Sequence, residues 1–100
     1  MTGAERIAAE RRRQVEVEGW TPEHDARHDH GDFQMTRAAV AYATAAQFAT
    51  LPGELATPLG WPWDKRWWKP SDDPLRNLEK AGALIAAEID RLLRLGGSDE

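Results

Sequence analysis

The chain has 100 residues and contains no cysteine. This absence excludes disulfide bonds, thiolate nucleophiles and every zinc site that uses a cysteine ligand. The sequence also lacks an apolar run of about eighteen residues, and its start lacks the short apolar segment behind basic residues that marks a secretory signal. We therefore expect a cytoplasmic protein that has no membrane partner.

Basic residues are fewer than acidic ones: the chain has 13 Lys and Arg against 17 Asp and Glu residues, which gives a net charge of -4. A protein that binds nucleic acid by neutralising many phosphates carries the opposite balance, so we expect neither DNA nor RNA as a partner. The sequence contains no glycine-rich phosphate loop and no Ser-His-Asp arrangement. The P-loop and nucleophilic-hydrolase classes are therefore set aside.

What the chain does have is a helical composition, with 41% hydrophobic residues but only 8 Gly and 6 Pro. We expect an all-α fold, a small bundle of three main helices, in a single domain over residues 1–96 with a flexible tail at 97–100. The helices are predicted over residues 3–18, 33–50 and 74–95, with a short helical turn after Trp20 and an irregular segment over 54–73.

Local signals fix these boundaries. Thr2 and Glu5 have the spacing of a capping box, and Gly19 is predicted to end the first helix in the left-handed conformation. Asp73 followed by Pro74 is a strong helix start. The last helix carries a stripe at helical spacing, formed by Leu75, Leu78, Gly82, Ile85, Ile89 and Leu92. This stripe predicts a helix-packing seam that a single copy does not bury completely, so we expect a homo-oligomer.

All three histidines lie in the segment 24–30, between two helices. His24, Asp25 and His28 are candidate ligand-binding residues, because one helical turn would place both imidazoles on the same face. Three interpretations stay open: turn-forming and solvated residues, recognition of a polar ligand, or a catalytic metal site. The sequence contains no HExxH pattern, and we assign no metal ligand and no catalytic residue.

Four of the five tryptophans lie in the irregular segment, interleaved with charged residues. Flat rings could stack on a base, while cations could bind phosphates. The alternative is that the indoles plug a small helical core. The candidate ligand-binding residues here are Trp61, Trp63, Asp64, Arg66, Trp67, Trp68 and Lys69, with Trp20 and Arg76 added from the flanking segments. We expect residues 11–13, all arginine, to form a solvated helix face, and Lys80 to face water.

Four runs of the sequence, ERRRQVEVEGWTPEHDARH, AAVAYA, WPWDKRWWKP and LRNLEKAGALIAAEIDRL, together resemble a family of short, mostly uncharacterised phage and prophage proteins. A fainter similarity links Arg13, Gly19, Trp20 and Asp25 to ryanodine-receptor-type repeat domains. The first resemblance implies a phage accessory protein. By analogy, such a protein could counter host defence by sequestering a nucleotide-derived immune signal.

The sequence thus predicts a non-enzymatic protein that binds a nucleotide-like small molecule and needs no cofactor. Binding is preferred over turnover because no complete set of acid, base and metal can be assembled. Two alternatives remain open. One is a metal-dependent nucleotide hydrolase that uses the His/Asp cluster, and the other is an inhibitor of a host enzyme that binds through exposed tryptophans.

Overall fold

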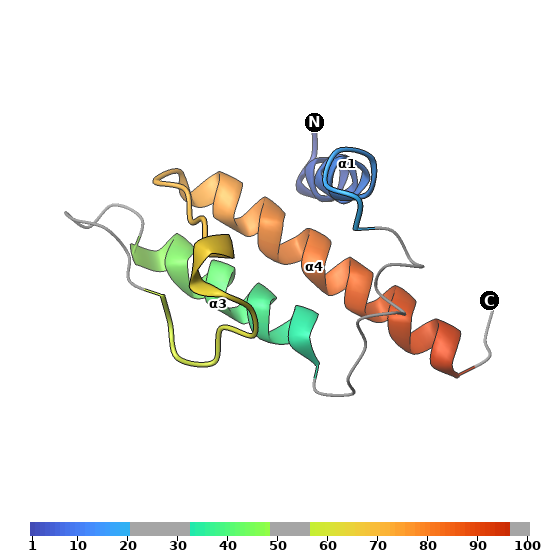
Figure 1. Ribbon diagram of the computed structural model, residues 1–100. Coiled ribbons are helices and arrows are strands. Elements are labelled where there is room, and N and C mark those ends of the chain that lie inside the picture. Colours follow the sequence, from blue (N-terminus) through green and yellow to red (C-terminus); the bar gives the residue numbers. More distant parts are fainter. Residues whose placement is uncertain (21–32, 49–56, 97–100) are drawn as a thin grey trace.

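The computed structural model describes residues 1–20, 33–48 and 57–96. These residues form three α-helices and one short 3-10 helix, and no strand is found among them: α1 is Gly3–Glu16, α3 is Gln34–Phe48, η1 is Lys65–Trp67 and α4 is Pro74–Leu95 (Figure 1). The all-α prediction is confirmed. No helix of the described part is long and apolar enough to cross a membrane.

The helix ends follow the local signals of the sequence. The Thr2 hydroxyl accepts a hydrogen bond from the backbone N–H of Glu5, whose side chain accepts from the Thr2 backbone, so the capping box is complete. Gly19 takes a positive φ of 76° after α1. Asp73 caps α4 by accepting from the N–H of Leu75. The first helix was predicted two residues too long at its C-terminal end, and the second was predicted to start one residue too early. The predicted end of the second helix, at residues 49 and 50, lies outside the described residues.

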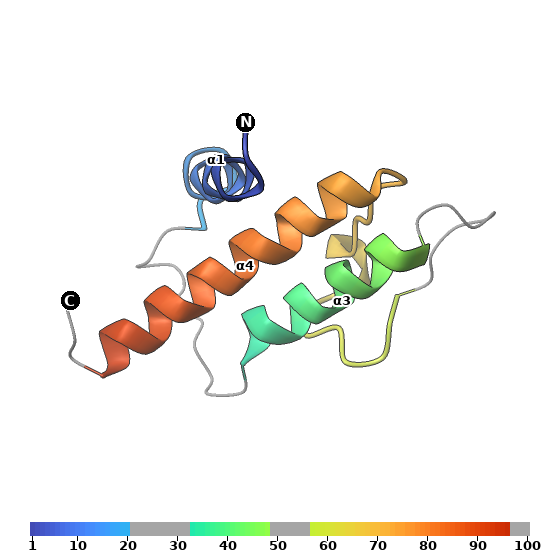
Figure 2. The ribbon, with the colours of Figure 1, turned by 180° about the vertical axis from the view of Figure 1, so that it is seen from behind.

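The two longer helices, α3 and α4, lie side by side and antiparallel, and their small residues form the core (Figures 1 and 2). Alanine faces let the two backbones approach closely, and Tyr42 and Leu84 fill the remaining space. The buried residues of this core cluster are Ala38, Ala39, Tyr42, Ala81 and Leu84. Because alanines contribute little apolar area, larger side chains from the loop must cover the core.

The N-terminus of α3 is capped from the neighbouring helix. Phe33 precedes α3 with a positive φ of 57°, and the Glu88 carboxylate on α4 accepts from both the N–H and the hydroxyl of Thr36. Glu88 is itself paired with Arg91 and is almost completely buried. A buried carboxylate thus provides an acceptor for a backbone N–H group in the first turn of α3 and fixes the register of α3 against α4.

Helix α1 crosses α4 on the side opposite α3, as both ribbon views show (Figures 1 and 2). The buried residues of α1 are polar, Glu10 and Gln14, and its Ile7 side chain lies over Gly82 of α4. A Cβ added at Gly82 would lie 2.5 Å from Cδ1 of Ile7. Glycine at this position therefore lets α1 approach the backbone of α4 closely.

The predicted seam of α4 is left about half exposed in the single chain. Its five large aliphatic side chains are 43–52% exposed, and the buried residues of α4 are instead alanines, Leu84, Asn77, Glu88 and Arg91. Incomplete burial by one copy agrees with the sequence prediction. The seam does not form the contact with α3, because the short α3 side chains pack on small partners, while the polar residues of α4 form hydrogen bonds in the interior. The expected homo-oligomer stays a prediction.

Replacing Glu88 tests the capping role. We expect Glu88→Ala to lower the free energy of unfolding by about 3 kcal/mol, because it removes the cap of α3 and the buried partner of Arg91. Urea denaturation followed by tryptophan fluorescence measures this change. Glu16→Ala, at an exposed position of α1, should leave the value within about 0.5 kcal/mol. Equal stabilities of the two variants would contradict the assignment.

Candidate ligand-binding cavity

Residues 57–73, which contain four tryptophans and are called the tryptophan segment below, are held by backbone turns and by one buried side chain. Gly60, at a φ of 88°, forms a turn closed by the N–H of Trp61 on the carbonyl of Pro58. At the other end, the buried Asn77 side chain donates to the carbonyl of Ser71 and accepts from its N–H, both at 2.8 Å. The Asn77 contacts anchor the segment to α4, although its only helical turn is the three-residue η1.

Four indoles form a connected cluster over Tyr42. Trp61 lies edge-on to Trp63 at 5.3 Å and contacts Trp68 at 5.0 Å, while Trp68 lies 4.9 Å from Tyr42. Trp20 extends the cluster through Trp63, at 6.2 Å. Each of the four is partly buried against the alanine core. These rings therefore cover the core, as one of the two open interpretations proposed, and pack mainly against each other.

Trp67 differs from the other indoles. It lies at the end of η1, is 52% exposed, and has Arg66 and Lys69 within 5.1 and 5.6 Å of its ring centroid. Asp64 caps η1 by accepting from the N–H of Arg66. The outcome is an exposed aromatic ring flanked by two cations.

Trp20 reaches the cluster because the chain reverses after α1. The backbone N–H of Trp20 donates to the backbone carbonyl of Gln14, and the backbone carbonyl of Trp20 accepts from the Arg11 guanidinium. Trp20 lies four residues beyond the end of α1 at Glu16, and its ring reaches that of Trp63 in the segment 57–73. Indoles distant in the sequence thus converge above α4.

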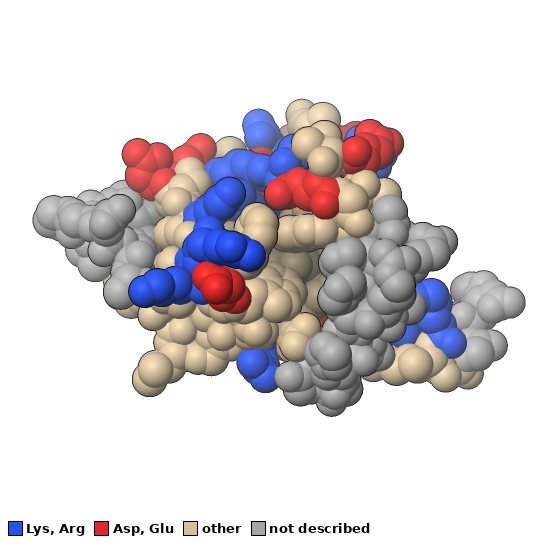
Figure 3. Space-filling view, viewed as in Figure 1, with Lys and Arg blue, Asp and Glu red and all other residues tan. Residues whose placement is uncertain are grey.

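A cavity of about 790 Å³ opens between α1, the tryptophan segment and the α3–α4 pair. Its volume is typical of small-molecule sites. Among the described residues its wall contains five aromatic rings, namely Trp20, Tyr42, Trp61, Trp63 and Trp67. The wall also holds six Lys or Arg and four Asp or Glu side chains, a local charge of +2 in a chain of net charge -4. Figure 3 shows Lys and Arg gathered, with carboxylates among them, on the face that carries η1.

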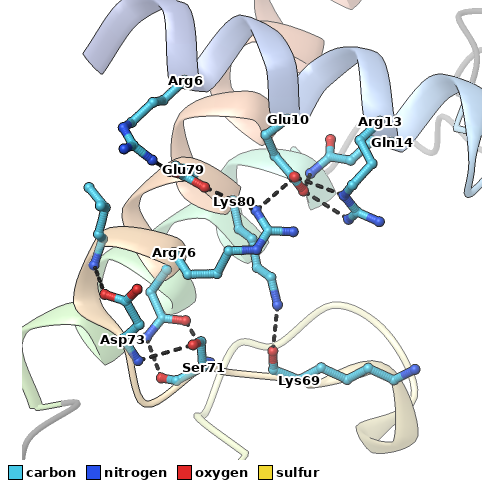
Figure 4. A network of polar contacts seen from close by, with 12 residues as sticks. Arg6, Glu10, Arg13, Gln14, Lys69, Ser71, Asp73, Arg76, Glu79 and Lys80 are labelled. Atoms are coloured by element: carbon cyan, nitrogen blue, oxygen red, sulfur yellow. Dashed lines mark hydrogen bonds and ion pairs between the residues drawn. The ribbon is translucent and has the colours of Figure 1, made fainter. Parts of the chain in front are cut away.

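One side of the cavity is an ion network centred on Glu10 (Figure 4). Its carboxylate accepts from Arg13, Arg76 and Gln14, with the shortest contact 2.7 Å from Arg76 Nη1. Burial alone would raise the pKa of Glu10, but the hydrogen bonds and charges of the two arginines lower it to about 2. Glu79 continues the network by joining Arg76 to Arg6.

Away from the Glu10 network, the cavity wall is formed where Lys69 of the tryptophan segment contacts α3 and α4. The Lys69 N–H donates to the Tyr42 hydroxyl at 3.3 Å, and its carbonyl accepts from Lys80 Nζ at 2.8 Å. Lys80 Nζ also lies 5.3 Å from the Tyr42 ring centroid. Burial, followed by the nearby charge of Arg76, lowers the pKa of Lys80.

Several predicted site residues meet at the cavity. The wall includes Trp20, Trp61, Trp63, Asp64, Trp67, Lys69 and Arg76. Arg66 and Trp68 are not part of it: Arg66 lies over Trp67, and Trp68 packs on Tyr42. His24, Asp25 and His28 lie outside the described residues.

Sequence reasoning missed the contribution of α1. Arg11 and Arg13 line the cavity, with only part of each side chain exposed, so the prediction of a solvated arginine face was wrong for both. Lys80, expected to face water, is half-buried on the cavity wall. The spacing of Ile7, Glu10 and Gln14 at one helix face could have revealed the docking side, because positions three and seven apart share a face.

No family model, curated protein or solved structure matched the chain in the comparisons made.

A metal site is not found within residues 1–20, 33–48 and 57–96, where no three His, Asp or Glu side chains gather closely enough. The two best-buried carboxylates near the cavity are already occupied, Glu10 by arginines and Glu88 by Arg91 and Thr36. What the described wall offers chemically is therefore aromatic surface and hydrogen-bond donors.

The lowered pKa of Glu10 makes the docking of α1 sensitive to acid. A carboxylate whose pKa falls from 4.5 to about 2 on folding stabilises the protein above pH 4.5, and that contribution is lost as the pH drops toward 2. We expect the wild type to melt higher than Glu10→Gln at pH 6, and the gap to shrink between pH 4.5 and 2. Circular dichroism at 222 nm measures the melting temperatures. A gap that stays constant over this range would contradict the role given to Glu10, and Glu16→Gln is the matched exposed control.

Proposed function

We propose that the protein binds and sequesters a nucleotide-derived small molecule in the cavity above α4. The observation that carries the proposal is the composition of the cavity wall, in which aromatic rings and an excess of cations meet within a volume suited to such a ligand. A nucleotide needs both features, a flat surface for the base and positive charge for the phosphates.

Trp67 is the best candidate to stack on the base. The rings of Trp61, Trp63 and Trp68 are engaged with each other and with Tyr42, whereas Trp67 is about half exposed at the cavity wall. Its two neighbouring cations place positive charge beside the stacking surface. A base on Trp67 would therefore keep its phosphates close to Lys and Arg side chains.

The state of the carboxylates favours binding over turnover. The pKa values of Glu10 and Glu88 are both lowered, in spite of burial, by hydrogen bonds from the partners that hold them. At neutral pH both are ionised and paired, so neither has a proton to donate as a general acid. This supports a non-enzymatic role for the described wall. The hydrolase alternative depends on His24 and His28, which lie outside the described residues.

The resemblance to short phage proteins extends the proposal. On that basis the captured molecule is a nucleotide-derived immune signal, and the protein is an accessory factor that lowers the free concentration of this signal in the host cytoplasm. The alternative function, inhibition of a host enzyme through exposed tryptophans, would depend on Trp67. Of the five tryptophans, Trp67 is exposed and the other four are partly buried.

Calorimetric titration of the purified protein with ADP-ribose and with cyclic di-AMP tests capture. We expect saturable binding of at least one of them, and about tenfold weaker binding in Trp67→Ala because a base stack is worth about 1–3 kcal/mol. Leu59→Ala is the control, since Leu59 is fully exposed in the same loop and does not line the cavity.

The fate of the ligand separates capture from catalysis. After saturation, heat denaturation should release the ligand with an unchanged mass, as mass spectrometry can show. A changed mass would replace sequestration with an enzymatic function. Absence of binding to both compounds, or equal affinity of the wild type and Trp67→Ala, would overturn the proposal.

A further inference from the structure

The backbone of Lys69 joins two polar side chains that come from different helices. Its N–H donates to the hydroxyl of Tyr42 on α3, and its carbonyl accepts from the ammonium of Lys80 on α4. All three residues line the cavity. Figure 4 shows Lys80 extending away from the Glu10 network to reach Lys69, while Arg76 turns toward Glu10. Arg76 and Lys80, both on α4, therefore have different surroundings.

Both side chains at Lys69 keep unused hydrogen-bond donors. An ammonium has three N–H groups, and Lys80 uses one of them within the described part of the chain. The Tyr42 hydroxyl accepts from Lys69, but its own proton has no acceptor among the described residues. Tyr42 is 6% exposed, and burial raises the pKa of its hydroxyl, so this proton stays on the oxygen at neutral pH.

Lys80 also forms no ion pair with a carboxylate of residues 1–20, 33–48 or 57–96. The carboxylate of Glu10 is already occupied by Arg13 and Arg76. A half-buried ammonium beside an arginine is unfavourable, which is why the pKa of Lys80 is lowered by burial and by Arg76. An anion placed against Lys80 would supply both the missing charge and the missing acceptors.

We propose that Lys80 and Tyr42, held in place by the Lys69 backbone, form an anion subsite of the cavity that binds the phosphate or pyrophosphate group of the captured molecule. The subsite rests on the proposed function for the identity of the rest of the ligand. Its own chemistry depends on the two N–H groups of Lys80 and the hydroxyl proton of Tyr42 that have no acceptor among the described residues, and on the charge of Lys80, which no described carboxylate pairs. The exposed Lys69 side chain lies at the same wall and adds a second cation.

Titration calorimetry with three probes, ADP-ribose, adenosine and inorganic pyrophosphate, tests the subsite. We expect the wild type to bind ADP-ribose at least tenfold more tightly than adenosine, and to bind pyrophosphate measurably. Lys80→Met should weaken binding of ADP-ribose and pyrophosphate about 10- to 100-fold, as expected for a charge-assisted hydrogen bond, and leave adenosine unchanged. Tyr42→Phe should weaken the same two probes about tenfold.

Matched variants separate a lost contact from a lost fold. Lys65→Met removes an exposed lysine of η1 that does not line the cavity, and it should bind all three probes like the wild type. Lys80→Arg keeps the charge and should restore most of the affinity for pyrophosphate. Melting curves identify any variant that fails to fold. If Lys80→Met is such a variant, the expected tenfold loss of pyrophosphate affinity in Tyr42→Phe, set against unchanged affinity in Lys65→Met, decides whether the subsite exists.

The outcomes distinguish the two proposals. Equal affinities of the wild type for ADP-ribose and adenosine would overturn the subsite and leave nucleoside capture standing. Pyrophosphate binding that is lost in Lys80→Met, without any gain from the adenosine group, would support the subsite and overturn nucleotide capture. If the wild type binds none of the three probes, both are overturned.

Discussion

The carboxylate of Glu10 is the contact on which the arrangement of the molecule depends. Helix α1 contacts α4 through a polar surface, and Glu10 lies at its centre, with hydrogen bonds from Arg13 and Gln14 on its own helix and from Arg76 on α4. A buried carboxylate without these donors would be costly. Its pairing therefore fixes the position of α1, and with it one entire wall of the cavity.

Ion pairing also decides which charges of the cavity remain available. The carboxylates near α1 and α4 are taken by arginines, whereas Lys69 and Lys80 have no described carboxylate partner. An acidic protein can in this way present a positive interior surface, because the excess negative charge lies elsewhere. The same pairing lowers the pKa of Glu10 and Glu88 and removes these two carboxyl groups as proton donors.

The tryptophan segment serves the fold and the cavity at once. A core of alanines buries little apolar area, so Trp61, Trp63 and Trp68 are needed to cover it, and their mutual packing orders a segment rich in proline. Trp67 is not required for that cover and stays exposed at the rim. Sequence reasoning weighed core against pocket for the group as a whole, but the structure divides the group between the two roles.

The sequence by itself determined the all-α class, the capping box at Thr2 and Glu5, and the start of α4 at Asp73, because each depends on residues within about one helical turn. It also identified the tryptophan segment as a candidate site from composition. Only the tertiary structure decided which face of α4 is buried, that Arg11 and Arg13 line the cavity, and that Lys80 meets Tyr42 at Lys69. These features depend on which surfaces meet across the chain, and burial of a polar side chain is set by a distant partner that no local pattern encodes.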